Sequence, residues 1–155
     1  MIKLKQIIFP RDKEKRRQVI TDCERFLEDE VSRRRGPSGL LIKTGFKALK
    51  GAKPGFIRAV MRDLVPEFCD ALEPLYRDYK EGGLGTFGDH MKRHPEQISE
   101  ALLSITDSKA DQSTNRLALK FYKKMRGRAQ NQVTDSVPGL ADLIDSHYEL
   151  PSTEQ

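Results

Sequence analysis

The sequence predicts an all-α fold, a single-domain bundle of about six to eight short and medium helices. Apolar residues recur with a period near 3.6 along almost the whole chain, which is the spacing of one face of a helix. After the first few residues, no run alternates apolar and polar side chains between hairpin turns, as a strand would. A chain of 155 residues also has the length of one domain.

The first two helices have clear start and stop signals. Asp12 is the expected N-cap of a long helix that ends near Arg33-Arg34-Arg35, just before Gly36-Pro37. Because cations in a last turn interact favourably with the helix dipole, we interpret the arginine triplet as part of this helix end rather than as a phosphate site. Ser38 is expected to open the second helix, and Lys53-Pro54-Gly55 to close it.

Prolines divide the helices predicted for the middle of the chain. A third helix is expected from about 56 to 64 and a fourth from Pro66 to about 80, in which Pro74 should cause a kink or a break. A short helix from about 87 to 93 follows, and Pro95 begins the next one.

The last third predicts a helix from about 115 to 125 and one or two more beyond it, divided at Pro138. No internal repeat or low-complexity linker interrupts the chain, so residues 1–150 are expected to form one helical domain. Residues 151–155 are expected to be a frayed C-terminal tail.

Two cysteines, Cys23 and Cys69, lie within apolar helical patterns. The chain has no C-x-x-C motif, no secretory signal and no apolar run near the ~18 residues that a membrane span requires. These observations indicate a cytoplasmic protein with two reduced, buried thiols, and one disulfide between them is the alternative. Since burial raises the pKa of a thiol, neither cysteine is expected to be a nucleophile.

Several short motifs, taken in order, resemble a known family. They are AKPGFIRAVMRDLVPEFCDALEPLY, FGDHM, ALLSITDSKA and VPGLADLIDSH. Together they are similar to an uncharacterised family of small helical bacterial proteins, catalogued as a domain of unknown function, over nearly the whole chain as far as His147. The resemblance implies an all-α fold of five or more helices. It implies no activity, and no catalytic residue is carried over from it.

The stretch EGGLGTFGDH contains the spacing G-x-G-x-x-G, which also marks dinucleotide-binding turns. Its glycines are Gly83, Gly85 and Gly88. A dinucleotide site needs a buried parallel strand before the turn, whereas the charged segment 76–81 precedes it here. We therefore interpret the glycines as a joint between two helices, with Gly82 or Gly83 at positive φ and Thr86 as the next N-cap.

His90 and His94 form H-x-x-x-H, which on a helix places two imidazoles on one face at a spacing that zinc sites use. A metalloprotease motif needs a glutamate directly after the first histidine, and Met91 stands there instead. The sequence places no third ligand, so we expect no metal and no cofactor. His94 is interpreted as a capping residue before Pro95.

The segment from Ser38 to Lys53 predicts a basic amphipathic helix. Lys43, Lys47 and Lys50 cluster within about 60° of arc, and we call them the lysine face. Such a helix either lies on an anionic membrane or an acidic partner, or it is a core helix with a lysine-rich outer side.

We favour the core helix for this segment. Gly45, Ala48 and Ala52 form a strip of small residues within the apolar arc, which suits the close approach of another helix. The lysine face then remains free for partners.

A second basic strip is expected on the helix near residue 115. It comprises Arg116, Lys120, Lys123 and Lys124, and it continues to Arg126 and Arg128. If the two helices are neighbours, the strip and the lysine face could form one patch.

The charge is distributed unevenly along the chain, whose net charge is +5. Residues 1–62 contain 17 Lys or Arg and 7 Asp or Glu, whereas residues 63–113 contain 5 and 11. The two segments either attract each other within the fold or leave a basic surface for an anionic partner.

We expect a non-enzymatic binding or adaptor domain that acts through the lysine face on an acidic protein or an anionic membrane surface. Nucleic-acid binding through non-specific phosphate contacts is one alternative, although no zinc finger and no aromatic stacking platform is present. An enzyme whose site residues converge only in the fold is the other alternative, with His90, Asp89 and His147 as candidates.

Overall fold

Residues 2–148, the part of the chain that this computed structural model describes, contain seven helices and no strand. The helices are α1 (Leu4–Ile8), α2 (Lys13–Arg33), α3 (Gly36–Ala52), α4 (Phe56–Gly82), α5 (Phe87–Lys92), α6 (Pro95–Gln112) and α7 (Arg116–Ser146). The predicted all-α bundle is confirmed. The frayed tail expected at residues 151–155 lies outside the described residues.

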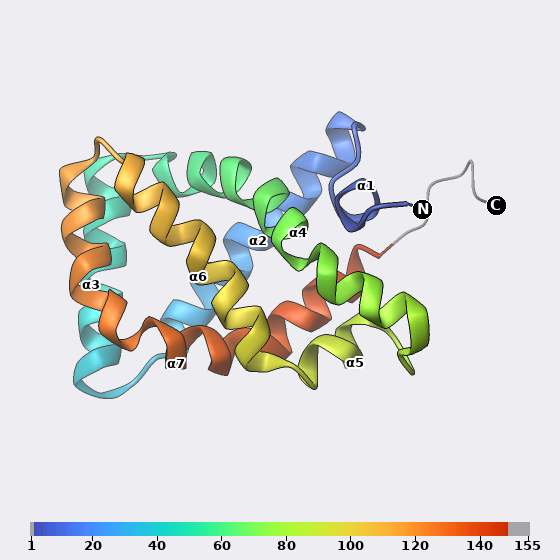
Figure 1. Cartoon of the computed structure of the whole chain (residues 1–155). Coiled ribbons are helices and arrows are strands. Elements are labelled where there is room, and N and C mark those ends of the chain that lie inside the picture. Colours follow the sequence, from blue (N-terminus) through green and yellow to red (C-terminus); the bar gives the residue numbers. More distant parts are fainter. Residues whose placement is uncertain (1, 149–155) are drawn as a thin grey trace.

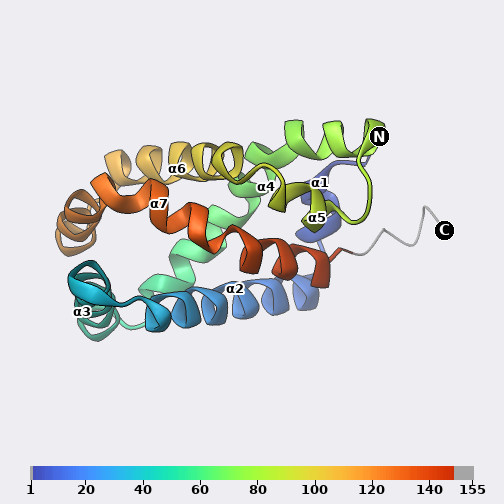
Figure 2. The same cartoon turned by 90° about the horizontal axis from the view of Figure 1, so that it is seen from below.

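The helices form an elongated bundle (Figure 1). At one end α3 lies beside the start of α7, and at the other end lie α1 and α5. In the view of Figure 2, α7 runs between α2 and α6, and it contacts both of them. α4 contacts α1, α2 and α6. No helix within residues 2–148 is long and apolar enough to cross a membrane.

Two helices continue through prolines where the sequence predicted a break. Pro66 and Pro74 lie inside α4, and Pro138 lies inside α7, so the predicted divisions at residues 65 and 138 are wrong. A proline in a helix interior removes one backbone hydrogen bond and costs ~3 kcal/mol. Burial of one apolar face along the uninterrupted helix offsets that cost. In α4 the buried residues lie before, between and after the prolines: Leu64, Val65, Cys69, Leu72, Leu75 and Tyr76.

The predicted helix ends are mostly confirmed. Asp12 caps α2, because its side chain accepts a hydrogen bond from the backbone N–H of Glu14 at 2.9 Å. Thr86 caps α5, and α2 ends at Arg33, as the sequence predicted. The expected start at Ser38 is wrong, since α3 already begins at Gly36, with a proline in its first turn, where a missing N–H costs nothing.

The most tightly packed part of the core includes α1, α5 and the C-terminal half of α4. Tyr76 and Phe87 are 1% exposed, and their rings pack edge to face with 5.2 Å between centroids. α1, which the sequence did not predict, adds Leu4 and Ile7, which are completely buried. Toward α3, by contrast, many apolar side chains are only partly buried.

Candidate functional site

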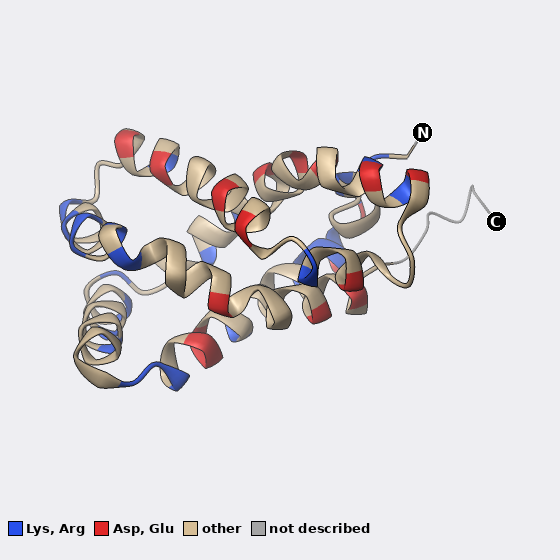
Figure 3. Ribbon diagram, turned by 60° about the horizontal axis from the view of Figure 1, so that its bottom comes forward, with Lys and Arg blue, Asp and Glu red and all other residues tan. Residues whose placement is uncertain are grey.

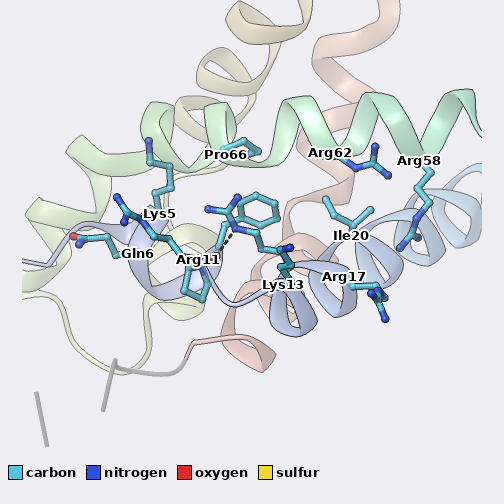
Figure 4. A pocket seen from close by; sticks show the side chains of 12 residues that line it. Lys5, Gln6, Arg11, Lys13, Arg17, Ile20, Arg58, Arg62 and Pro66 are labelled. Carbon is cyan, nitrogen blue, oxygen red and sulfur yellow. Dashed lines mark hydrogen bonds between the residues drawn. The ribbon is translucent and has the colours of Figure 1, made fainter. Parts of the chain in front are cut away.

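A groove lined by basic side chains lies between α4 and the segment that contains α1 and the start of α2 (Figure 4). Its volume is about 930 Å³. All the charged residues that line it are cations, and we call it the basic groove. These cations are Lys5, Arg11, Lys13, Arg16, Arg17, Arg58 and Arg62.

Helical spacing gathers most of these cations. Lys13, Arg16 and Arg17 stand three and four residues apart at the start of α2, so they share one side of that helix. Arg58 and Arg62 have the same four-residue spacing on α4. In Figure 4 the side chain of Arg58 extends from α4 toward α2, so the two helices present their cations to a common space.

Two guanidinium groups of the basic groove are held in place by neighbours. The guanidinium of Arg16 lies 4.6 Å from the centre of the Phe9 ring, and its Nε donates a hydrogen bond to the carbonyl oxygen of Pro10. Nη1 of Arg58 pairs with Glu24 at 3.1 Å. Because these side chains are already ordered, an anion that binds them incurs a smaller entropy cost.

Three other cations of the basic groove have no acidic partner among the described residues. Arg11, Lys13 and Arg62 form no side-chain ion pair or hydrogen bond within residues 2–148. Arg11 and Lys13 lie where α2 begins, and Arg62 lies opposite on α4. The groove therefore presents uncompensated positive charge from both of its sides.

The ion pairs at the edge of the basic groove compensate little of this charge. Lys5 pairs with Asp70 at 3.2 Å, and Arg17 pairs with Glu14 at 3.4 Å, all four side chains being at least 41% exposed. Such exposed pairs contribute about 0–1 kcal/mol. Within the described residues, Lys5 is the one groove cation that pairs with the acidic segment 63–113.

The chemistry of the lining suits the binding of an anion. Five of the seven cations are arginines, whose planar guanidinium matches a carboxylate or a phosphate through two parallel hydrogen bonds. Among the described residues, the lining includes no carboxylate, imidazole, thiol or hydroxyl group that could act as acid, base or nucleophile.

The lysine face is exposed on α3, as the sequence predicted. Gly45 lies against α7, where a Cβ atom in its place would overlap the ring of Phe121. This contact confirms the close approach of another helix at Gly45. Ala48 and Ala52 are exposed, so the expectation that they share this contact is wrong. Lys43 and Lys47 are exposed and have no side-chain partner among the described residues, whereas Lys50 pairs with Glu28 of α2.

The second basic strip is exposed on α7, next to α3, and Figure 3 shows Lys and Arg positions at this end of the molecule. At 100° per residue, the lysine face lies about 140–160° round α3 from Gly45. Round α7, the angle from Phe121 is likewise about 100–160° for Arg116, Lys120 and Lys123, and about 60° for Lys124. Since Gly45 and Phe121 mark the contact between the helices, the two sets of cations point mainly away from each other.

Further along the second basic strip, Arg126 is engaged within the protein. Its Nε and Nη2 donate hydrogen bonds of 2.7 and 3.0 Å to the two carboxylate oxygens of Asp107. These bonds, together with one from Tyr122, hold the pKa of Asp107 below its ordinary value. Arg126 therefore joins α7 to α6 and is not available to an external anion.

The glycine stretch joins α4 to α5, as predicted, and a helix rather than a strand precedes it. The expectation of a positive φ at Gly82 or Gly83 is wrong. Gly82 is helical and Gly83 has a φ of −72°, whereas Gly85 has a φ of +79°. The chain leaves α4 in an extended conformation and makes its left-handed turn two residues later, directly before Thr86.

The three candidates for a catalytic site do not converge in the structure. Asp89 accepts a hydrogen bond from the backbone N–H of Thr86, and His147 contacts Asp22 of α2 at 2.8 Å. His90 packs beside His94, with 4.7 Å between ring centroids. Within residues 2–148, no group of three histidine, cysteine or acidic residues is placed to hold a metal ion.

The cysteines have the environments that the sequence predicted. Cys69 is buried and Cys23 is partly buried, and both are free thiols. Burial raises the pKa of each thiol to about 12, with neighbouring negative charges adding to the effect. At neutral pH both remain protonated and unreactive.

Sequence analysis did not identify the basic groove, although one signal pointed to it. All seven groove cations lie within residues 1–62, where Lys and Arg outnumber Asp and Glu by ten. Which of those charges would converge depended on how α4 packs against α2, and that packing is not encoded in any local motif.

The fold and the groove define a class of protein, an all-α bundle with a basic groove and no assembled catalytic group among its described residues. The chain belongs to a family of unknown function (DUF6918), whose model matches residues 7–148. No curated protein and no solved structure matches it.

Proposed function

We propose that this protein is a non-enzymatic, cytoplasmic binding or adaptor protein that captures an acidic segment of a protein partner in the basic groove. The observation that carries the proposal is the lining, in which seven cations face a common space without any carboxylate. Three of them, Arg11, Lys13 and Arg62, have no acidic partner among the described residues.

The shape of the groove favours an acidic segment over a flat anionic surface. Its cations come from α1, the segment before α2, α2 and α4, and they line a space of about 930 Å³. A chain that enters this space can meet cations on both sides, whereas a flat membrane surface would reach mainly those at the rim. The volume also exceeds what one phosphate group would fill, so several linked anionic groups suit it better.

The apolar part of the lining favours a polypeptide over a nucleic acid. Single-stranded nucleic acids bind strongly where bases stack on exposed aromatic rings. Phe9 is the aromatic residue of this lining, and it is 5% exposed beneath the guanidinium of Arg16. The groove therefore offers charge without a stacking platform.

The experiment compares two charge reversals of equal size. A fluorescent peptide rich in glutamate is titrated with the wild-type protein, with R11E/K13E/R62E in the groove, and with K120E/K123E/K124E on α7. We expect the groove variant to lose about tenfold or more in affinity and the α7 variant to lose about twofold or less. A glutamine-rich peptide is the neutral control, and binding should weaken as salt increases.

Equal losses in the two variants would show that only net charge matters, and would overturn the proposal. Anionic vesicles and a generic RNA are titrated in the same way. If either binds more tightly than the peptide and depends on the same three groove residues, the ligand is a membrane or a nucleic acid, and the acidic-segment proposal fails.

A further inference from the structure

A second cavity lies between the helices of the bundle, away from the basic groove, and it is partly open to solvent. It has a volume of about 370 Å³ and adjoins a space of about 380 Å³. We call the two together the central apolar cavity, because they share most of their middle wall. The shared lining residues are Leu27, Val31, Ile42, Met61, Leu64, Thr106, Gln132 and Val133.

The cavity extends along the bundle. One part reaches Ile8 of α1 and Ile144 near the end of α7, and the other reaches Phe56 of α4 and Phe121 of α7. In Figure 1, α1 and the end of α7 lie at one end of the molecule and the starts of α4 and α7 at the other, so the space is longer than it is wide. Its form suits a chain better than a compact molecule.

An unfilled apolar space of this size between packed helices is unusual. Interiors are packed as densely as organic crystals, and few voids exceed the size of a water molecule. In another protein, an engineered apolar cavity of about 150 Å³ stays dry and binds benzene. Ligand pockets are typically about 300–1,000 Å³, mostly apolar, with a few polar groups that orient the ligand.

One polar atom in the cavity wall lacks a partner. The side-chain oxygen of Gln132 is buried and accepts no hydrogen bond, although Gln132 lines both parts of the cavity. The nearby guanidinium of Arg34 is already paired with Glu30 at 3.2 Å. The wall therefore offers one hydrogen-bond acceptor but no free charge.

We propose that the central apolar cavity binds one long alkyl chain whose hydroxyl or amide end donates a hydrogen bond to Gln132, where the two parts of the cavity meet, and whose methylene groups extend from there into one part. The apolar wall matches the methylene groups, and the unpartnered amide oxygen matches the donor. This site is separate from the basic groove, and the proposal does not depend on the acidic partner.

Binding is measured first with cis-parinaryl alcohol, a fluorescent fatty alcohol, added to the full chain. We expect saturable fluorescence enhancement at one molecule per protein. The charge-reversed groove variant R11E/K13E/R62E should bind it as the wild type does, which separates this site from the basic groove. If the wild-type protein shows no saturable binding, the proposal is overturned whatever the variants do.

The location of the binding site is tested by filling the central apolar cavity with a larger side chain. V133F places a larger side chain in the shared wall, and we expect it to weaken binding of the fluorescent alcohol by about tenfold or more while the protein remains helical. L117F is the matched control, because Leu117 is exposed and lies outside this lining. M61F provides a second filling variant if V133F does not fold. Unchanged binding in a folded filling variant would overturn the proposal.

The role of Gln132 is tested by displacing the bound fluorescent alcohol with dodecanol and with methyl dodecanoate, which lacks a donor. Dodecanol should displace the probe more effectively from the wild-type protein. In Q132L this preference should disappear while the chain itself still binds. A preference for dodecanol that persists in Q132L would overturn the assignment of Gln132.

Discussion

Asp145, near the end of α7, accepts a hydrogen bond of 2.8 Å from the backbone N–H of Gly88 in α5. Its other carboxylate oxygen accepts a hydrogen bond of 2.7 Å from the hydroxyl of Thr86. One carboxylate thus satisfies one of the N-terminal backbone donors of α5, binds the capping hydroxyl of Thr86, and fixes that helix against α7. The third glycine of the G-x-G-x-x-G spacing serves this helix contact and not a nucleotide.

Gly88→Ala is expected to destabilise the protein. A Cβ at this position would lie 2.6 Å from Cγ of Asp145 and 2.8 Å from the carbonyl oxygen of Ala141, so α5 would have to move away from α7. Such overpacking costs about 1–3 kcal/mol. Urea denaturation followed by circular dichroism measures the change in the free energy of unfolding.

Gly127→Ala is the matched control for this prediction. Gly127 is also helical, but a Cβ there would meet nothing within 4 Å. Alanine should therefore stabilise α7 by up to about 1 kcal/mol. A Gly88→Ala variant as stable as Gly127→Ala would contradict the close packing of α5 on α7.

Gly45→Ala should likewise weaken the contact between α3 and α7. A Cβ at Gly45 would be 3.1 Å from Cγ of Phe121 and closer still to other atoms of the ring, which would have to shift. We expect a loss of about 1–3 kcal/mol in the free energy of unfolding. Gly51 on the same helix has open space around it, so Gly51→Ala should stabilise the protein in the same urea denaturation measurement. Equal effects at both positions would show that Gly45 is not a contact point.

The sequence predicted those parts of the fold that depend on local signals. Asp12 and Thr86 cap helices because their side chains hydrogen-bond to the backbone within the next three residues. Pro66 and Pro74 misled the prediction, because their effect depends on whether the helix beyond them buries an apolar face, and that is a property of the packed bundle. α1 was missed because a helix of five residues has too few residues for a periodic pattern.

The candidate site was less predictable than the fold. The lysine face lies on one helix, so its 3.6-residue spacing is visible in the sequence. Arg16 and Arg62, by contrast, belong to helices that are far apart in the chain and meet only when α4 packs against α2. The unequal distribution of charge indicated that a basic site exists near the N-terminus, but no sequence spacing indicated its members.

Arg34→Ala should cost much more stability than Arg33→Ala, although both arginines pair with Glu30. The side chain of Arg34 is 18% exposed and also donates hydrogen bonds to Ser136 and to the carbonyl oxygen of Gln132, whereas Arg33 is 68% exposed. Loss of the partly buried arginine removes its hydrogen bonds to Ser136 and Gln132 and one charge partner of the Glu30 carboxylate, which is only 13% exposed, and we expect this to cost about 2–3 kcal/mol.

The ion pair between the exposed Arg33 and Glu30 should contribute less than about 1 kcal/mol to the free energy of unfolding. Urea titration of both variants measures the two free energies of unfolding under the same conditions. If Arg33→Ala and Arg34→Ala lose the same amount, the burial of the Arg34 network does not determine its strength.

His90 should make the protein less stable as the pH falls below neutral. Both ring nitrogens of His90 are buried and have no hydrogen-bond partner within the described residues. Burial, together with the positive charges of His94 and Arg93, lowers the pKa of His90 in the folded protein, whereas Asp78 acts weakly in the opposite direction. The unfolded chain then binds more protons than the folded one below about pH 6.5, so acid favours unfolding. The free energy of unfolding should therefore fall as the pH decreases through the folded-state pKa.

Replacement of His90 tests the predicted loss of stability at low pH in two ways. His90→Leu and His90→Gln both remove the titrating group, so each should flatten the dependence of unfolding free energy on pH between about 7 and 5. Leucine alone also removes the two unpartnered polar atoms, and it should be the more stable variant at pH 7. Urea denaturation at a series of pH values measures both effects. Since His94 remains in each variant, profiles parallel to the wild type would assign the acid sensitivity to another group.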